Sequence, residues 1–409
     1  MNLLSSTSVF SFYTLLSRVL GYLRDILIAI FLGTSIYADA FFVAFRLPNT
    51  FRRLFAEGTF NAAFIPSYAE ENLKGEGSGK KFADEVFSLL LLFLIFLIII
   101  IEIFTPFLVY LIAPGFYDDS EKFNLAVEFT RITFPFLLFV SLSSLLAGIL
   151  NTNNKFAAAA AAPIVLNIIL ILFLLISFYF NQNIAKSLSI GVTLAGIIQF
   201  IILIFFTKKF YFPSLVLILK FNKKIKIFFS KLLPSIFSSG ITQINILVGT
   251  IIASFQSGAI SYLYYADRVY QINLAIAGIA VGTVALPNLT KSIKLNDQKN
   301  INKVQNKSIE LSLLLSVPAT VGLFIASKEI VNCLFGYGSF DSEDVIYTSM
   351  ALTFFAIGVP AFALNKILST FYFARNNTKL PFYISLVSMI TNIIISVSLF
   401  KKYGFIIIP

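Results

Sequence analysis

Residues 17–25 read SRVLGYLRD, which places Arg18, Arg24 and Asp25 inside a segment otherwise apolar enough to cross a membrane. An ionisable side chain at the centre of a bilayer costs about 2.5–3.5 kcal/mol on insertion scales. A chain keeps several such residues only where they perform a task. This stretch therefore predicts a membrane helix with a functional polar face.

The composition of the whole chain agrees with this assignment. Hydrophobic residues make up 58% of 409 residues, charged residues 12%, and the mean hydropathy is +0.88. A soluble domain of this length carries far more charge on its surface. Long apolar runs approach the roughly 20 residues that cross a bilayer. The chain is therefore predicted to be an all-α integral membrane protein.

We predict eleven membrane spans from these runs. Their approximate bounds are 6–32, 36–60, 84–112, 124–150, 157–180, 187–207, 230–254, 258–289, 306–326, 345–373 and 380–400. Lysine and arginine concentrate in the loops that follow even-numbered spans, which predicts that these loops and the N-terminus are cytoplasmic. The net charge of +11 is thus read as a topology signal, and no nucleic-acid partner is predicted.

Several residue types that carry chemistry are scarce. The chain has no His, no Trp and a single Cys, Cys333. This composition excludes His-based catalysis, a structural zinc site and an intramolecular disulfide. The N-terminus has neither a basic region nor a small-residue cleavage site, so no cleaved signal peptide is predicted.

The chain also repeats itself at an offset near 224 residues. Tyr37-Ala38-Asp39 recurs as Tyr265-Ala266-Asp267, and three further short matches follow in the same order. This repeat predicts two pseudo-symmetric helical lobes around a central cavity. The predicted parts are an N-terminal lobe over 1–207, a basic cytoplasmic linker over 208–229 and a C-terminal lobe over 230–409. The second lobe has five of an expected six spans.

Helical phase places the charges of the first span on one side. With 100° per residue, Asp25 falls about 20° from Arg18, and leucines occupy the opposite face. Gly21 is expected to leave the polar face open as a cavity wall. The structural alternative is that Arg18 and Asp25 pair and only stabilise the helix.

The second span carries further charges. Helical phase groups Asp39, Arg46, Arg53 and Glu57 on one stripe, with Arg52 off it. Pro48 is expected to break this helix and to make the phase beyond it unreliable. The alternative for the arginine pair at 52–53 is snorkelling to the cytoplasmic interface.

A second group of charges lies at the repeat-equivalent position, Asp267-Arg268, where an intrahelical ion pair is the alternative. Arginine binds phosphate oxygens through a planar fork and stays charged when desolvated. Arg18, Arg24 and Arg268, with Arg52 below, therefore predict an anionic ligand with several phosphate oxygens.

At these residues the sequence resembles the MurJ/MviN family of lipid II flippases, within the multidrug/oligosaccharidyl-lipid/polysaccharide exporter superfamily. The matching stretches are SRVLGYLRD (17–25), ADAFFVAFRLPNTFRRLFAEGTFNAAFIP (38–66), YYADRVYQ (264–271), GTVALPNLTK (282–291) and LFGYGSFDSED (334–344). The family typically has fourteen spans, so the resemblance implies that spans 12–14 are missing here.

The resemblance implies that Arg18, Arg24 and Arg268 contact a lipid diphosphate in the cavity. It places Arg52 and Glu57 toward the cytoplasm and Asp39 toward the periplasmic gate; Asp25, Arg53 and Asp267 are expected to pair charges or to act in gating. The implied partners are lipid II and membrane lipids, and transient contact with the cell-wall synthesis machinery stays open. No cofactor and no sodium site are predicted. The implied location is the bacterial inner membrane.

Three rival functions stay open. Another exporter of the superfamily could carry a different lipid-linked saccharide or a drug, although a drug antiporter should present acidic and aromatic residues rather than arginines. A membrane enzyme acting on a lipid diphosphate would need a base or nucleophile beside the arginines. A structural scaffold would tolerate alanine at Arg18, Arg24 and Arg268.

Overall fold

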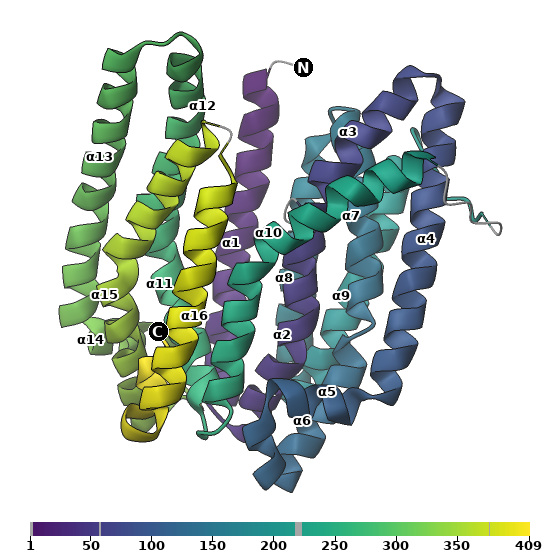
Figure 1. Ribbon diagram of the computed structural model, residues 1–409. Helices are drawn as coiled ribbons and strands as arrows, with labels where there is room; N and C mark the ends of the chain where they lie inside the picture. Colours follow the sequence, from purple (N-terminus) through teal and green to yellow (C-terminus); the bar gives the residue numbers. More distant parts are fainter. Residues whose placement is uncertain (1–2, 57–58, 217–222, 376) are drawn as a thin grey trace. The chain divides into compact units, whose positions relative to one another are not determined.

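The computed structural model describes residues 3–56, 59–216, 223–375 and 377–409, and every regular element in these ranges is a helix (Figure 1). Eight helical segments of the described chain are long and apolar enough to cross a membrane. The predicted all-helical membrane class is thereby confirmed. The chain forms two compact units: unit 1 comprises Met1–Leu32 and Ile36–Leu247, and unit 2 comprises Gly33–Ser35 and Val248–Pro409.

Unit 1 holds the first ten α-helices and one short 3-10 helix. They are α1 (Leu3–Leu32), α2 (Ile36–Ala56), α3 (Thr59–Leu73), α4 (Glu76–Ile103), α5 (Thr105–Ile112), η1 (Pro114–Asp118), α6 (Ser120–Thr133), α7 (Phe136–Thr152), α8 (Phe156–Tyr179), α9 (Ile184–Thr207) and most of α10 (Lys223–Ala253). Inside this unit α1 packs on α8, α2 on α6, and both α7 and α8 on α9. Residues 230–247, assigned by the sequence to the second lobe, lie in unit 1.

Two predicted elements of unit 1 differ in the structure. The span predicted over 84–112 is divided at Phe104 into α4 and α5. The expectation that Pro48 breaks its helix is wrong, because α2 continues from Ile36 to Ala56 with Pro48 inside it. Proline leaves the carbonyl four residues earlier without its helical partner. Thr133 Oγ1 donates to that carbonyl, the Ala44 oxygen, at 3.1 Å, and so compensates for the missing bond.

The start of α10 is buried against α3 and α4. Phe228 packs edge-on against Phe60 and Phe82 at centroid distances of 5.8 and 6.1 Å. Aromatic pairs in this arrangement contribute about 0.5–1.5 kcal/mol beyond their buried area. The part of the predicted cytoplasmic linker that lies in α10 is therefore a packed element of unit 1.

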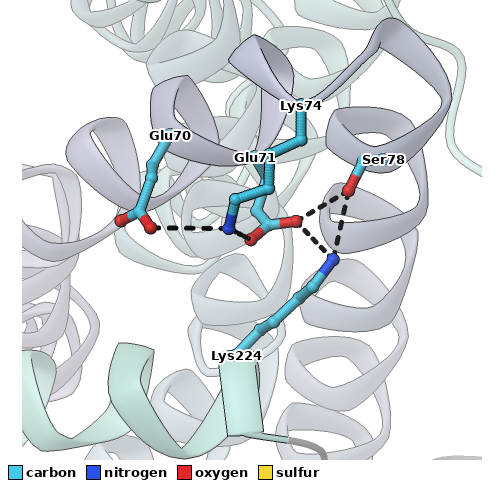
Figure 2. A network of polar contacts seen from close by, with 5 residues as sticks. All are labelled: Glu70, Glu71, Lys74, Ser78 and Lys224. Carbon is cyan, nitrogen blue, oxygen red and sulfur yellow. Dashed lines mark hydrogen bonds and ion pairs between the residues drawn. The ribbon is translucent and has the colours of Figure 1, made fainter.

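A polar network fixes the same helix start (Figure 2). The buried Glu71 carboxylate of α3 forms ion pairs with Lys224 of α10 and, at 2.7 Å, with Lys74. Ser78 of α4 donates to Glu71 at 2.7 Å, and Lys224 donates to Ser78 at 3.1 Å. One carboxylate thus joins three helices.

Acid should release this network. Burial alone would raise the pKa of Glu71, but hydrogen bonds from Lys224, Lys74 and Ser78 lower it from 4.5 to about 2. A pKa lowered by folding contributes stability above the unfolded value, and this contribution is lost as the pH falls through the folded value. We expect the thermal midpoint of the purified protein to exceed that of Glu71→Gln above about pH 5. The difference should shrink from pH 4.5 to 2. A difference that does not change with pH would contradict this role.

Unit 2 consists of helices from the second part of the chain. They are α11 (Ala259–Leu274), the π-helical η2 (Ala275–Ala280), α12 (Val281–Lys294), α13 (Gln298–Ile325), α14 (Ser327–Phe335), α15 (Ser342–Phe373), α16 (Lys379–Tyr403) and η3 (Gly404–Ile407). Tyr262 contacts Tyr347, and Tyr270 contacts Phe355. Contacts that advance together along both helices show that α11 and α15 run parallel, side by side.

The turn Gly33–Ser35, which connects α1 and α2, packs within unit 2. Gly33 has φ +57°, and a Cβ on it would lie 2.3 Å from the Ser339 carbonyl oxygen, so only glycine fits there. Its own carbonyl accepts a hydrogen bond from the Tyr265 hydroxyl at 3.0 Å, and Thr34 Oγ1 donates to Asp344. This turn is held by buried polar contacts.

Candidate functional site

The charges of residues 17–25 form a buried network on α1. Arg24 Nη2 and Nε lie 2.6 and 3.0 Å from Asp25 Oδ1. Arg24 Nη1 donates to Asn167 Oδ1 of α8 at 3.0 Å. Arg24 is 7% exposed and Asp25 2%. Asp25 therefore pairs with its neighbour Arg24, whereas the sequence alternative paired it with Arg18.

Asn167 lies against the face of α1 around Gly21, which was expected to be open as the wall of a cavity. Its amide lies beside Gly21, where an added Cβ would be 3.4 Å from Asn167 Nδ2. The same nitrogen donates to the Ser17 carbonyl oxygen at 2.9 Å. The expectation that Gly21 leaves the helix face open is wrong, because the Asn167 amide, which also binds Arg24, lies against it.

Arg18 differs from Arg24 in both exposure and pairing. Its side chain is exposed and lies six residues before Arg24 on the same helix. Within the part of the chain that the structure describes, no carboxylate lies within ion-pair distance of it. A guanidinium retains five N–H donors when no protein group uses them. Among the arginines of α1, Arg24 is paired with a carboxylate, and the described chain supplies no such partner to Arg18.

Asp39, at the start of α2, is fully buried and bound. Its Oδ2 lies 2.6 Å from Lys122 Nζ of α6, with side-chain exposures of 0% and 5%. The Lys122 ammonium also lies 4.3 Å from the centre of the Phe116 ring. This pair joins α2 to α6 and leaves no net charge at that position.

Of the remaining predicted residues of the second span, Arg46 lies at the middle of α2, and Arg52 and Arg53 lie near its end. Arg46, Arg52 and Arg53 are half-buried. Arg52 Nε donates to Asn49 Oδ1 at 3.0 Å, which orients its side chain along its own helix. Glu57 lies outside the described residues.

In unit 2 the predicted pair Asp267-Arg268 lies on α11, and both residues are half-buried. Asp267 Oδ2 accepts a hydrogen bond from Gln271 Nε2. The Arg268 guanidinium carbon lies 4.6 Å from the centre of the Tyr264 ring, in a cation–π contact. An aromatic face holds a guanidinium without neutralising its charge.

Three polar partners were not identified as site residues from the sequence. Asn167 interrupts an otherwise apolar run, which is a usable signal for a buried polar contact in a membrane helix. Lys122 lies between the predicted spans 84–112 and 124–150, where a lysine carries no sign of a buried role, and Gln271 has no signal beyond its spacing from Asp267. The described ranges contain no cluster of three acidic, Cys or His residues that could hold a metal.

A family profile and curated relatives of this chain point to the same protein family. A profile described as "Lipid II flippase MurJ" matches residues 28–409. The probable lipid II flippase MurJ of Rickettsia prowazekii (strain Madrid E) is 41% identical over 396 residues, which cover 96% of this chain and 77% of the relative. The corresponding protein of Rhizobium tropici is 39% identical over 392 residues, covering 95% and 74%.

Solved structures agree with the sequence matches. A lipid II flippase MurJ in an inward closed conformation has a TM-score of 0.86 and 31% identity, covering 98% of this chain and 83% of that one. An inward-facing MATE multidrug resistance transporter has a TM-score of 0.78 over 96% and 89% of the two chains, at 12% identity. The second match is informative for the fold alone.

Proposed function

The chain belongs to the MurJ family of lipid II flippases, and on that premise we propose how it performs the transport. It moves the undecaprenyl-diphosphate-linked peptidoglycan precursor from the cytoplasmic to the periplasmic leaflet of the bacterial inner membrane by alternating access. The protein is a transporter and not an enzyme. The lysine distribution among the loops supports a cytoplasmic N-terminus.

One observation carries the proposal for the binding site: Arg18 is an exposed arginine without a carboxylate partner in the described chain, on a helix whose sequence predicts a membrane span. Diphosphate oxygens can pair with the Arg18 guanidinium through a bidentate contact and supply the negative charge that it lacks in the described chain. Arg24, oriented by Asp25 and Asn167, and Arg268, stacked on Tyr264, provide further donors in this proposal. Arg52, at the cytoplasmic end of α2, would contact the substrate as it enters.

Complementation tests this function. A bacterium depleted of its own lipid II flippase should grow and keep its shape when it expresses this chain, and lipid II should stop accumulating in the cytoplasmic leaflet. Expression at the membrane, verified by immunoblot, is the control. Failure despite good expression, with rescue by a flippase known to work in that host, would contradict the proposal. Rescue of a different lipid-linked saccharide pathway instead would favour the other exporters.

A further inference from the structure

The segment between α9 and α10 follows α4 as an extended strap over Tyr211–Val216. The Tyr211 hydroxyl donates to Asp84 Oδ1 at 2.8 Å, and the Ser214 amide donates to the same oxygen at 2.9 Å. The Val216 amide donates to Ser88 Oγ at 2.9 Å. Side chains of α4 therefore hold this strap through two backbone amides and one tyrosine hydroxyl.

The strap lies alongside the start of the apolar run of α4. Asp84 comes just before this run, which begins at Val86, and Ser88 lies in its first turn. Non-helical backbone is tolerated at the edge of the hydrocarbon region only when its polar groups have partners. The bonds to Asp84 and Ser88 supply partners for two amides, which fits a strap that enters the membrane interface.

The outward face of the strap is apolar and its beginning is basic. Phe212 and Leu215 are 68% and 62% exposed. Lys208 and Lys209, just before them, are also exposed, and Lys208 Nζ lies 4.0 Å from the centre of the Phe205 ring. Exposed apolar side chains bordered by lysines match the boundary between acyl chains and headgroups.

The two lysines are also electrostatically available. At the same end of unit 1, Lys224 is paired with Glu71, and Lys74 with both Glu70 and Glu71. Within the described residues, no carboxylate lies within ion-pair distance of Lys208 or Lys209. A phosphodiester with a net negative charge is the partner that complements two adjacent free ammonium groups on an apolar base.

We propose that the strap inserts into the membrane interface and, together with the two lysines that precede it, binds an anionic phospholipid. Lys208 and Lys209 contact its headgroup phosphate, and Phe212 and Leu215 lie among the acyl chains. Asp84 and Ser88 are positioning residues that hold the strap at this depth. This site is separate from the arginines proposed to bind the transported lipid.

The absence of tryptophan from the chain permits a direct test. Phe212→Trp introduces a single fluorescent reporter on the strap. The variant is placed in phosphatidylcholine vesicles with a small, equal fraction of brominated phosphatidylcholine or brominated phosphatidylglycerol, because bromine quenches tryptophan on contact. We expect quenching by both lipids, with a clear preference for the anionic one. Each lysine should contribute about fivefold to this preference, so Lys208→Gln/Lys209→Gln should lower it about 25-fold.

Two matched variants complete the test. Phe180→Trp, 63% exposed at the end of α8, places the reporter at the opposite end of α9 and should show no preference between the lipids. Leu215→Trp is a second strap reporter, for which the same result is expected. It replaces Phe212→Trp in the test if Phe212→Trp folds poorly. Emission typical of water and no quenching from both strap reporters would overturn the proposal. Equal quenching by the two lipids, unchanged in the lysine variant, would also overturn it.

Discussion

Replacing Arg18 with alanine should weaken the binding of undecaprenyl diphosphate about 10- to 100-fold. A hydrogen bond to a charged group contributes about 1.5–3 kcal/mol, and each 1.4 kcal/mol changes an affinity tenfold. Arg18 is the cleanest position for this measurement, because its exposed side chain has no carboxylate that the substitution would leave unpaired in the described chain. Titration calorimetry on purified protein measures the affinity directly.

Two variants make the Arg18 result specific. Arg18→Lys keeps the charge but loses the planar fork, so its affinity should fall between those of wild type and Arg18→Ala. Arg131→Ala removes an exposed arginine from α6, outside the proposed site, and should bind as wild type does. Equal affinity of wild type and Arg18→Ala, with unchanged thermal midpoints, would remove Arg18 from the binding site.

Asp39→Ala should destabilise unit 1 by about 3–5 kcal/mol, because it leaves the Lys122 ammonium buried without its carboxylate. The two side chains are 0% and 5% exposed and lie 2.6 Å apart. Asp39→Leu/Lys122→Met replaces both charges by apolar groups and should recover most of the loss. Equilibrium unfolding in detergent with increasing denaturant measures the three free energies.

The chain offers a matched exposed pair for comparison. Lys186 and Glu128 form an ion pair at 2.8 Å with side chains 51% and 45% exposed. Exposed pairs contribute about 0–1 kcal/mol, so Glu128→Ala should change the free energy of unfolding far less than Asp39→Ala. A loss in the apolar double variant as large as in Asp39→Ala would show that Asp39 stabilises unit 1 through contacts other than Lys122.

Local sequence was sufficient to predict an all-helical membrane protein, because an apolar run of about 20 residues has the length of a helix that crosses a bilayer. Helical phase predicts a polar side of α1, since it depends only on neighbours in the chain. The contacts that decide what those residues do come from distant elements. Asn167 reaches Arg24 from α8, and Lys122 reaches Asp39 from α6.

The errors have the same origin. Pro48 remains in a continuous helix because Thr133, on another helix, binds the carbonyl that proline frees. Gly21 is covered because Asn167 approaches it from α8. The anchor of α10 depends on Glu71, which looks like an ordinary charge near the end of α3 until Lys224 is placed beside it. Partners far apart in sequence leave no periodic signal.

The rate at which purified protein moves lipid II across a vesicle bilayer tests the central claim most directly. Lipid II is loaded on the inner leaflet, and its appearance outside is followed with a membrane-impermeant reagent that modifies the exposed headgroup. Wild type should accelerate this appearance well above protein-free vesicles, and Arg18→Ala should remove most of the acceleration. Folded wild type that moves lipid II no faster than protein-free vesicles would contradict the account.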